Sequence, residues 1–306
     1  MKKRVLSILT ALALTLGLCT PLGGLMPEAK AAEIVDDGTC GANATWTLDS
    51  NGTLTVSGEG DMYFYGTDSN GNFVMPSNIS LEYIGWNDYR DRIRSVVIGE
   101  GITSVCMFAF ESCTNLTSVS LPQSLVDLDG FRYCTSLTKI VIPDGVKYIH
   151  NSAFKGTGLE SVYLPDRVIE IEPSVFEDCT SLKTVRMPSS VEVMSWSVFE
   201  GCTNLTSVTL PEGVTRLDNT FRGCSSLKSV NVPLSVTYMY EAFYQSGVED
   251  IYYAGTQEQW DAIRKAGLSM SDKIVIHYNS QSPDQPEERP QNSTIPTPVL
   301  ERAEYI

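Results

Sequence analysis

One phrase of about 22 residues recurs along most of this chain and limits what the chain can fold into. The copies at 176–194 and 199–217 read FEDCTSLKTVRMPSSVEVM and FEGCTNLTSVTLPEGVTRL. A regular period of this length indicates a solenoid, because one unit cannot bury its apolar face without a neighbour stacked against it. The same point of the phrase is marked every 21 to 23 residues by an aromatic, at Phe110, Phe131, Phe154, Phe176, Phe199, Phe221 and Phe243.

Each unit contains a short strand followed by a return path. In LTSVTLP at 205–211, Val208 and Leu210 alternate with polar residues, which is the period of a strand with one buried face. Pro211 ends the strand because it cannot donate a ladder hydrogen bond. The period lies in the leucine-rich repeat range, so we expect a parallel β-sheet on one face of the solenoid. About eight rungs are predicted, opening at Ile93, Leu116, Leu137, Leu159, Leu182, Leu205, Leu227 and Val248.

The segment before the repeats predicts a cap. ATWTLDSNGTLTVSG at 44–58 contains two alternating stretches joined by Asn51-Gly52, which is the strongest short signal for a β-hairpin. We therefore expect residues 32–92 to form an N-terminal cap with a β-hairpin. In this cap, Trp46 and Trp86 are expected to shield the apolar core of the first rung.

The segment after the repeats predicts a second cap. The solenoid is expected to span 93–253, and residues 254–279 leave the pattern. Thr256 is placed as the N-cap of a short helix, and KIVIHYN at 273–279 reads as a final strand. A C-terminal cap is physically required because an open sheet edge recruits other chains.

Both termini differ in composition from the repeats. Residues 1–31 resemble a signal peptide, with a basic start, an apolar run at 5–18 and the small-x-small site Ala29-Lys30-Ala31. The chain is therefore expected to be secreted or displayed on the cell surface, with no membrane insertion after signal removal, because no later apolar stretch is long enough. Residues 280–306 begin rich in proline and poor in apolar residues, which predicts a disordered linker or tail.

Charge and motifs narrow the possible functions. The chain has 37 acidic and 22 basic residues and a net charge of −15, which argues against nucleic acid as a partner. It has two histidines, no G-x-S-x-G turn and no phosphate-binding loop. We therefore expect neither catalysis nor a cofactor or metal.

Cysteines recur at one slot of the repeat, three residues after the aromatic. A metal site needs several ligands converging on one point, whereas each coil offers a single thiol here. Disulfides suit an exported chain, but neighbouring side chains in a ladder run parallel rather than toward each other. Packing is the favoured interpretation, because a free Cys behaves as a small buried hydrophobe. The predicted structural ladder consists of Cys113, Cys134, Cys179, Cys202 and Cys224.

The repeat phrase and both caps resemble the BspA-like family of bacterial leucine-rich repeat proteins. The resemblance rests on the unit A-F-x-x-C-x-x-L-x-x-V-x-L-P-x-x-V-x-x-I, on CGANATWTLDSNGTLTVSGEGDM at 40–62 and on IYYAGTQEQWDAI at 251–263. It implies an exported, non-catalytic protein that adheres to host matrix or to other cells. It names no ligand, because the exposed positions decide specificity.

The strand face of the solenoid is the predicted binding surface. Tyr163 and Arg186 fall on adjacent rungs and point outward, and these residue types often anchor interfaces. Nearby lysines are expected to make the face locally basic, and the partner is expected to be a protein or glycan on a host or bacterial surface. The predicted binding residues are Lys139, Val141, Tyr163, Lys183, Arg186, Thr209, Lys228, Asn231 and Tyr252.

Two other functions stay open from the sequence. The proline-rich segment ending in VLERAEYI is compatible with a binding or targeting module of a longer exported enzyme whose catalytic domain lies beyond residue 306. The repeats are equally compatible with a purely structural surface component.

Overall fold

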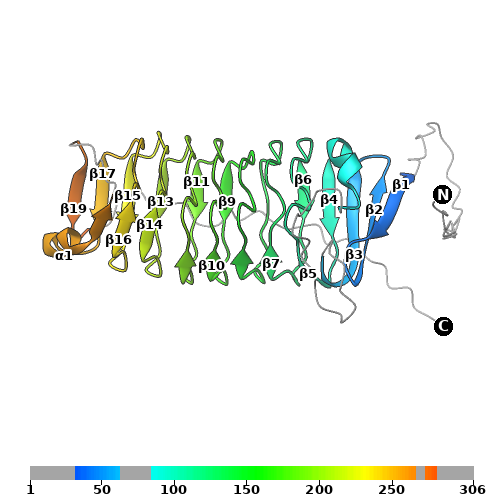
Figure 1. Cartoon of the computed structure of the whole chain (residues 1–306), viewed down its shortest axis with the longest axis horizontal. Helices are drawn as coiled ribbons and strands as arrows, with labels where there is room; N and C mark the ends of the chain where they lie inside the picture. The colour runs from blue at the N-terminus through cyan, green and yellow to red at the C-terminus, as the bar shows by residue number, and fades with distance from the viewer. Residues whose placement is uncertain (1–31, 63–83, 267–272, 281–306) are drawn as a thin grey trace, which may run out of the picture. The chain divides into compact units, whose positions relative to one another are not determined.

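The computed structural model describes residues 32–62, 84–266 and 273–280. Figure 1 shows successive coils stacked side by side, with their strands arranged in rows along the stack. The predicted fold class is confirmed: the chain forms a leucine-rich repeat solenoid with parallel sheets and an N-terminal antiparallel hairpin. The predicted signal peptide and nearly all of the predicted tail lie outside the described residues.

The predicted parallel strands form one side of the solenoid, which we call the strand face. Their inward residues are the apolar ones of the repeat, such as Val162, Val185 and Val208, all buried. The coil at 137–143 follows the same path but forms no strand, so the face divides into two sheets there. The strands are β4 (Ser95–Ile98), β6 (Ser118–Ser120), β9 (Ser161–Tyr163), β11 (Thr184–Arg186), β13 (Ser207–Thr209), β15 (Ser229–Val232) and β17 (Asp250–Tyr253).

The return path of each coil adds a second row of short parallel strands that the sequence did not predict. This return face arises because the segment after each proline also alternates, with one apolar residue such as Ile149 or Leu217 buried between two outward side chains. Its strands are β5 (Ile102–Ser104), β7 (Asp127–Leu128), β8 (Tyr148–Ile149), β10 (Glu170–Ile171), β12 (Val193–Met194), β14 (Arg216–Asp218), β16 (Tyr238–Tyr240) and β18 (Arg264–Ala266).

The repeated aromatics stack into one continuous row inside the coils. From Phe154 to Phe243, neighbouring ring centroids lie 5.6 to 5.9 Å apart and the rings are within 8° of parallel. Trp86 continues the row beyond Phe110 at 5.5 Å, and Trp46 meets Trp86 edge-on at the same distance. Both tryptophans are buried, so the row is closed at the N-terminal end as predicted for the cap.

The N-terminal cap is a three-stranded antiparallel meander of β1 (Ile34–Thr39), β2 (Asn43–Asp49) and β3 (Thr53–Asp61). Its hairpin turn has Gly52 at φ +85°, and the Asp49 carboxylate accepts hydrogen bonds from the N–H groups of Asn51 and Thr53. The strand β3 then pairs in parallel with both β4 and β5, which joins the cap to both faces. The 3-10 helix η2 (Asn87–Arg92) follows.

The C-terminal cap contains the predicted helix and strand. The helix α1 (Gln257–Ala262) begins with a reciprocal capping box between Thr256 and Gln259, and its Trp260 packs edge-on against Tyr253. It is followed directly by β18, which extends the return face beside β16. The strand β19 (Val275–Tyr278) pairs with β17 and extends the strand face.

Candidate binding surface

Register places variable outward side chains of neighbouring rungs beside one another along the strand face. Tyr163 lies directly opposite Arg186 on the next strand. Further along, Thr209, Asn231 and Tyr252 are in register on consecutive strands, followed by His277 on β19. The fold therefore brings together side chains that are separated by about one repeat in the sequence.

The Tyr163–Arg186 pair forms a compact cluster with Asp166. The Arg186 guanidinium lies 4.7 Å from the centre of the Tyr163 ring and donates to both carboxylate oxygens of Asp166, at 2.6 and 3.0 Å. It also donates to the carbonyl of Leu164. These hydrogen bonds lower the pKa of Asp166 and raise that of Arg186, so both stay charged at neutral pH.

A shallow hollow of about 510 Å³ borders this cluster. Tyr163 and Asp166 form part of its wall, together with Gln123, Asp144, Gly145 and Arg167. The lining is polar and carries both signs of charge. Such a surface can hold hydroxyl, amide or carboxylate groups of a ligand, with the Tyr163 ring as its aromatic member.

The C-terminal half of the row is held together by its own contacts. The Tyr252 and His277 rings stack with centroids 4.5 Å apart, and His277 contacts the Asp250 carboxylate through Nε2 at 2.6 Å. Asn231 donates to the Thr209 hydroxyl at 3.3 Å. Asn231 is only 8% exposed, which corrects its prediction as an exposed contact residue: it leaves little surface open to a partner.

The expectation of a locally basic strand face is also wrong. Lys183 pairs with Glu160 at 3.1 Å and Lys228 with Glu249 at 2.6 Å, each acid lying one rung away. Lys183, Lys228 and Arg186 are therefore each neutralised by a carboxylate. The sequence did not indicate that these acids lie beside them. Lys139 forms no ion pair with any described residue, and it lies beside the exposed Val141 in the coil without a strand.

The five repeat cysteines lie in one buried row of free thiols. Four of these thiols donate a hydrogen bond to the backbone carbonyl of the Phe in the preceding coil. Cys202, for example, donates to Phe176 at 3.0 Å. Thr157, which occupies this slot in one coil, contacts the Cys179 thiol at 3.3 Å. Burial raises the pKa of Cys224 to about 12, so its thiol is protonated at neutral pH.

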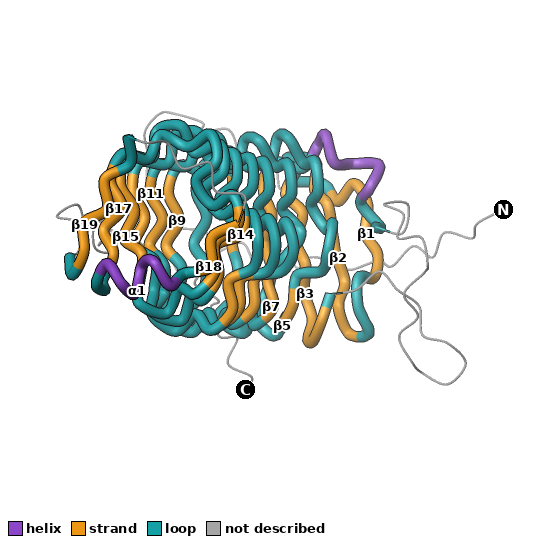
Figure 2. The backbone as a smooth tube through the Cα atoms, turned by 60° about the vertical axis from the view of Figure 1, so that its left-hand side comes forward, coloured by secondary structure: helices purple, strands orange, loops and turns teal. Residues whose placement is uncertain are grey.

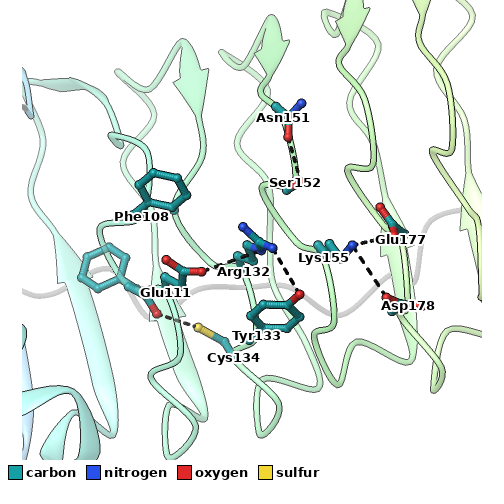
Figure 3. Close-up of polar contacts among 12 residues, drawn as sticks. Phe108, Glu111, Arg132, Tyr133, Cys134, Asn151, Ser152, Lys155, Glu177 and Asp178 are labelled. Carbon is teal, nitrogen blue, oxygen red and sulfur yellow. Dashed lines mark hydrogen bonds and ion pairs between the residues drawn. The ribbon is translucent and has the colours of Figure 1, made fainter. Parts of the chain in front are cut away.

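A third side of the solenoid carries an ion ladder that sequence reasoning missed. We call it the corner row; it consists of the residue directly after each aromatic. Figure 3 shows Arg132 between Glu111 and Tyr133, and Lys155 between Glu177 and Asp178. The signal was present in the repeat alignment, where this slot is charged in six of seven coils and carries both signs: Glu111, Arg132, Lys155, Glu177, Glu200, Arg222 and Tyr244.

Comparison with known proteins places the chain in a family. The BspA type leucine-rich repeat region matches residues 60–165 and 147–262, in six copies. These matches span more than half of the chain, so it belongs to the BspA-type leucine-rich repeat family, and the resemblance seen in the sequence is confirmed. No curated protein matches the chain. No helix in the described residues is long and apolar enough to cross a membrane.

Three solved structures of bacterial leucine-rich repeat proteins are similar to this chain. A leucine-rich repeat protein from Bacteroides ovatus ATCC 8483 is 24% identical, with a TM-score of 0.53 over 77% of this chain, and this chain spans 60% of its length. A leucine-rich repeat protein from Eubacterium ventriosum ATCC 27560 is 20% identical, with a TM-score of 0.42 over 71% of this chain and 72% of that one. A leucine rich cell surface protein from Faecalibacterium prausnitzii A2-165 is 20% identical, with a TM-score of 0.30 over 80% of this chain and all of that one. The similarity to the Bacteroides ovatus protein supports the fold. The other two similarities have TM-scores below 0.5 and support no conclusion about this chain.

Proposed function

We propose that this protein is an exported, non-catalytic binding protein that attaches to host matrix or to other cells through its strand face. Membership of a repeat family built around extended surfaces supports a binding role. Export is inferred from the signal-peptide pattern at 1–31. The two alternatives, a module of a longer enzyme and a purely structural component, stay hypotheses that no contact in the described residues favours.

The observation that carries the proposal is the Tyr163–Arg186–Asp166 cluster beside the 510 Å³ hollow. The salt bridge orients the guanidinium and holds the Tyr163 ring at the edge of the hollow. A partner group that enters the hollow would therefore meet a preorganised aromatic face and would not have to order it. The proposed contact region centres on Tyr163, with Lys139, Val141, Thr209 and Tyr252 along the same face.

The test is a Tyr163→Ala/Arg186→Ala double variant. The purified chain is applied to arrays of matrix proteins and glycans and to bacterial cells, and we expect the double variant to lose at least about tenfold in affinity for the partner found, since paired aromatic and Arg anchors dominate interfaces. Arg132→Ala/Tyr133→Ala is the matched control, because it removes a similar stacked pair on the corner side, with the guanidinium 4.8 Å from the ring centre. Equal binding by wild type and the Tyr163/Arg186 variant would show the proposed surface to be wrong.

A further inference from the structure

We propose that the return face carries a second docking site, separate from the strand face, which accepts an acidic segment of a protein partner. The site is defined here as the return-face patch, and no part of it was predicted from the sequence. It spans four neighbouring coils in the C-terminal half of the solenoid, where Figure 2 shows β14 and β18 on the same side. Its residues are Val193, Trp196, Arg216, Tyr238, Tyr240 and Arg264.

The centre of the patch is a cation–aromatic–cation stack. Arg216, Tyr238 and Arg264 lie in register on the parallel strands β14, β16 and β18. Both guanidiniums lie over the Tyr238 ring, with their central carbons 4.2 and 5.6 Å from its centroid. The Tyr238 ring therefore restrains two cations on neighbouring strands, which reduces the ordering cost when they bind an anionic group.

The second observation is an exposed apolar edge beside the stack. Trp196 is 56% exposed, although a Trp normally buries most of its surface. The corresponding positions of neighbouring coils hold Asn151, Pro173 and Asp218, so the corner does not require a large aromatic. Val193 and Tyr240 are exposed as well, which extends the apolar surface toward the cations.

Charge identifies the kind of partner. The chain has a net charge of −15, yet this patch presents two arginines. Arg216 pairs with Asp218 of its own strand at 2.9 Å, whereas the exposed Arg264 forms no ion pair within the described part of the chain. Guanidinium groups bind carboxylates in a bidentate manner, so the complementary ligand carries Glu or Asp side chains.

Residue types favour a protein partner over a polysaccharide. Trp, Tyr and Arg are the side chains that most often anchor protein interfaces. The combination of Val193 with Trp196 provides a dehydrated apolar contact, which an aliphatic or aromatic side chain fills better than a hydroxylated sugar ring. The inferred ligand is therefore an acidic peptide segment with at least one large apolar residue near its carboxylates.

Intrinsic fluorescence reports on this site. The chain has four tryptophans, and Trp46, Trp86 and Trp260 are buried. An exposed indole emits at longer wavelength, so covering Trp196 shifts the emission to the blue. The probe is a synthetic peptide that alternates Glu with Leu and Phe, titrated into the purified chain at low and at high ionic strength. We expect a saturable blue shift that weakens at high salt, because the proposed contact is partly ionic.

Variants separate this site from the strand face. We expect Trp196→Ala to abolish the fluorescence shift and, in fluorescence anisotropy with labelled peptide, to weaken binding at least about tenfold. Arg264→Gln is expected to weaken binding several-fold and to reduce the salt dependence. Lys147→Gln is the charge-matched control, since this exposed lysine lies on a coil outside the patch. The Tyr163→Ala/Arg186→Ala variant is expected to bind the peptide normally, so the two surfaces can fail independently.

Three results would overturn the inference. The first is unchanged peptide binding in Trp196→Ala, with the fold verified by circular dichroism. The second is equal binding of a peptide in which every Glu is replaced by Gln. The third is occupation of the patch by a different partner: either an anionic polysaccharide such as polyglucuronate that binds in preference to the peptide, or a second copy of the chain. Self-association would be detected by sedimentation, abolished by Trp196→Ala and seen without any peptide binding.

Discussion

The inner aromatic row and the outer corner row are adjacent in sequence but follow opposite rules. Along the inner row, the same residue recurs in seven coils, and its rings stack at 5.2 to 5.9 Å. Along the corner row, one residue further on, the side chain varies in type and charge, and acids pair with bases of the neighbouring coil, as Glu177 does with Lys155. The inner row requires the same aromatic side chain in every coil, because each ring packs on the next. The corner row requires only that neighbouring side chains attract one another, so residue types on the outer surface can vary without loss of the fold.

The largest effect is expected from breaking the inner row in its middle. Phe176 is fully buried and stacks on Phe154 and Phe199, 5.6 and 5.7 Å away. We expect Phe176→Ala to lower the free energy of unfolding by about 3–5 kcal/mol, because it leaves a cavity between two coils. Urea denaturation followed by circular dichroism measures this loss.

Phe243 provides the matched control because it ends the row. Among the described residues, Phe221 is the one aromatic ring on which it stacks, at 5.9 Å. In a solenoid each coil is stabilised by its immediate neighbours, so Phe243→Ala is expected to cost less than Phe176→Ala. Equal losses at the two positions would contradict the view that the row acts through neighbour contacts.

Most of the fold was predictable from the sequence because the inner row obeys a strict period. The recurrence of Phe, Cys and the strand residues defined the coils, and the Asn51-Gly52 turn identified the hairpin. The return-face strands of the repeats were missed because each buries a single apolar residue, such as Ile149, whereas the strand-face segments bury two at a spacing of two, such as Val208 and Leu210. Their pairing depends on neighbouring coils and not on local sequence.

The candidate site was less predictable because its side chains interact between coils. The outward direction of Tyr163 and Arg186 followed from alternation, and their register followed from the repeat. The pairing of Lys183 with Glu160 depends on side-chain rotamers and on the lateral offset of two coils. Neither can be predicted from the spacing of residues in the sequence. The same holds for the burial of Asn231, which is only 8% exposed. Sequence therefore located the surface but not its net charge.

A smaller change in the free energy of unfolding is expected from substitution of Asp129 on the return path, and this change should stabilise the protein. This side chain is buried, and burial raises its pKa from 3.8 to about 7, although the Gly130 N–H donates to it and His150 lies nearby. Folding therefore favours the protonated acid. The stability contributed by protonation is fully present below about pH 3.8 and is lost as the pH rises through about 7.

Replacing Asp129 by Asn removes this titration while keeping the oxygen that accepts from Gly130. We expect Asp129→Asn to raise the free energy of unfolding by about 2 kcal/mol at pH 8 and by much less at pH 5. Thermal unfolding at both pH values measures the difference. A variant that is destabilised equally at pH 5 and pH 8 would show that Asp129 is held by contacts beyond this one hydrogen bond.

The smallest effects concern the outer ion pairs, and their ranking follows from exposure. The side chains of Lys155 and Glu177 are 16% and 21% exposed on the corner row, whereas those of Lys183 and Glu160 are 60% and 51% exposed on the strand face. Water screens the second pair more strongly, so double-mutant cycles with Lys→Met and Glu→Gln are expected to give coupling energies of about 1 and about 0.3 kcal/mol respectively. Added salt should reduce the Lys183–Glu160 coupling first. A larger coupling energy for Lys183–Glu160 than for Lys155–Glu177 would contradict this ranking. It would mean that Lys183 has a structural role on the strand face and cannot be substituted without loss of stability.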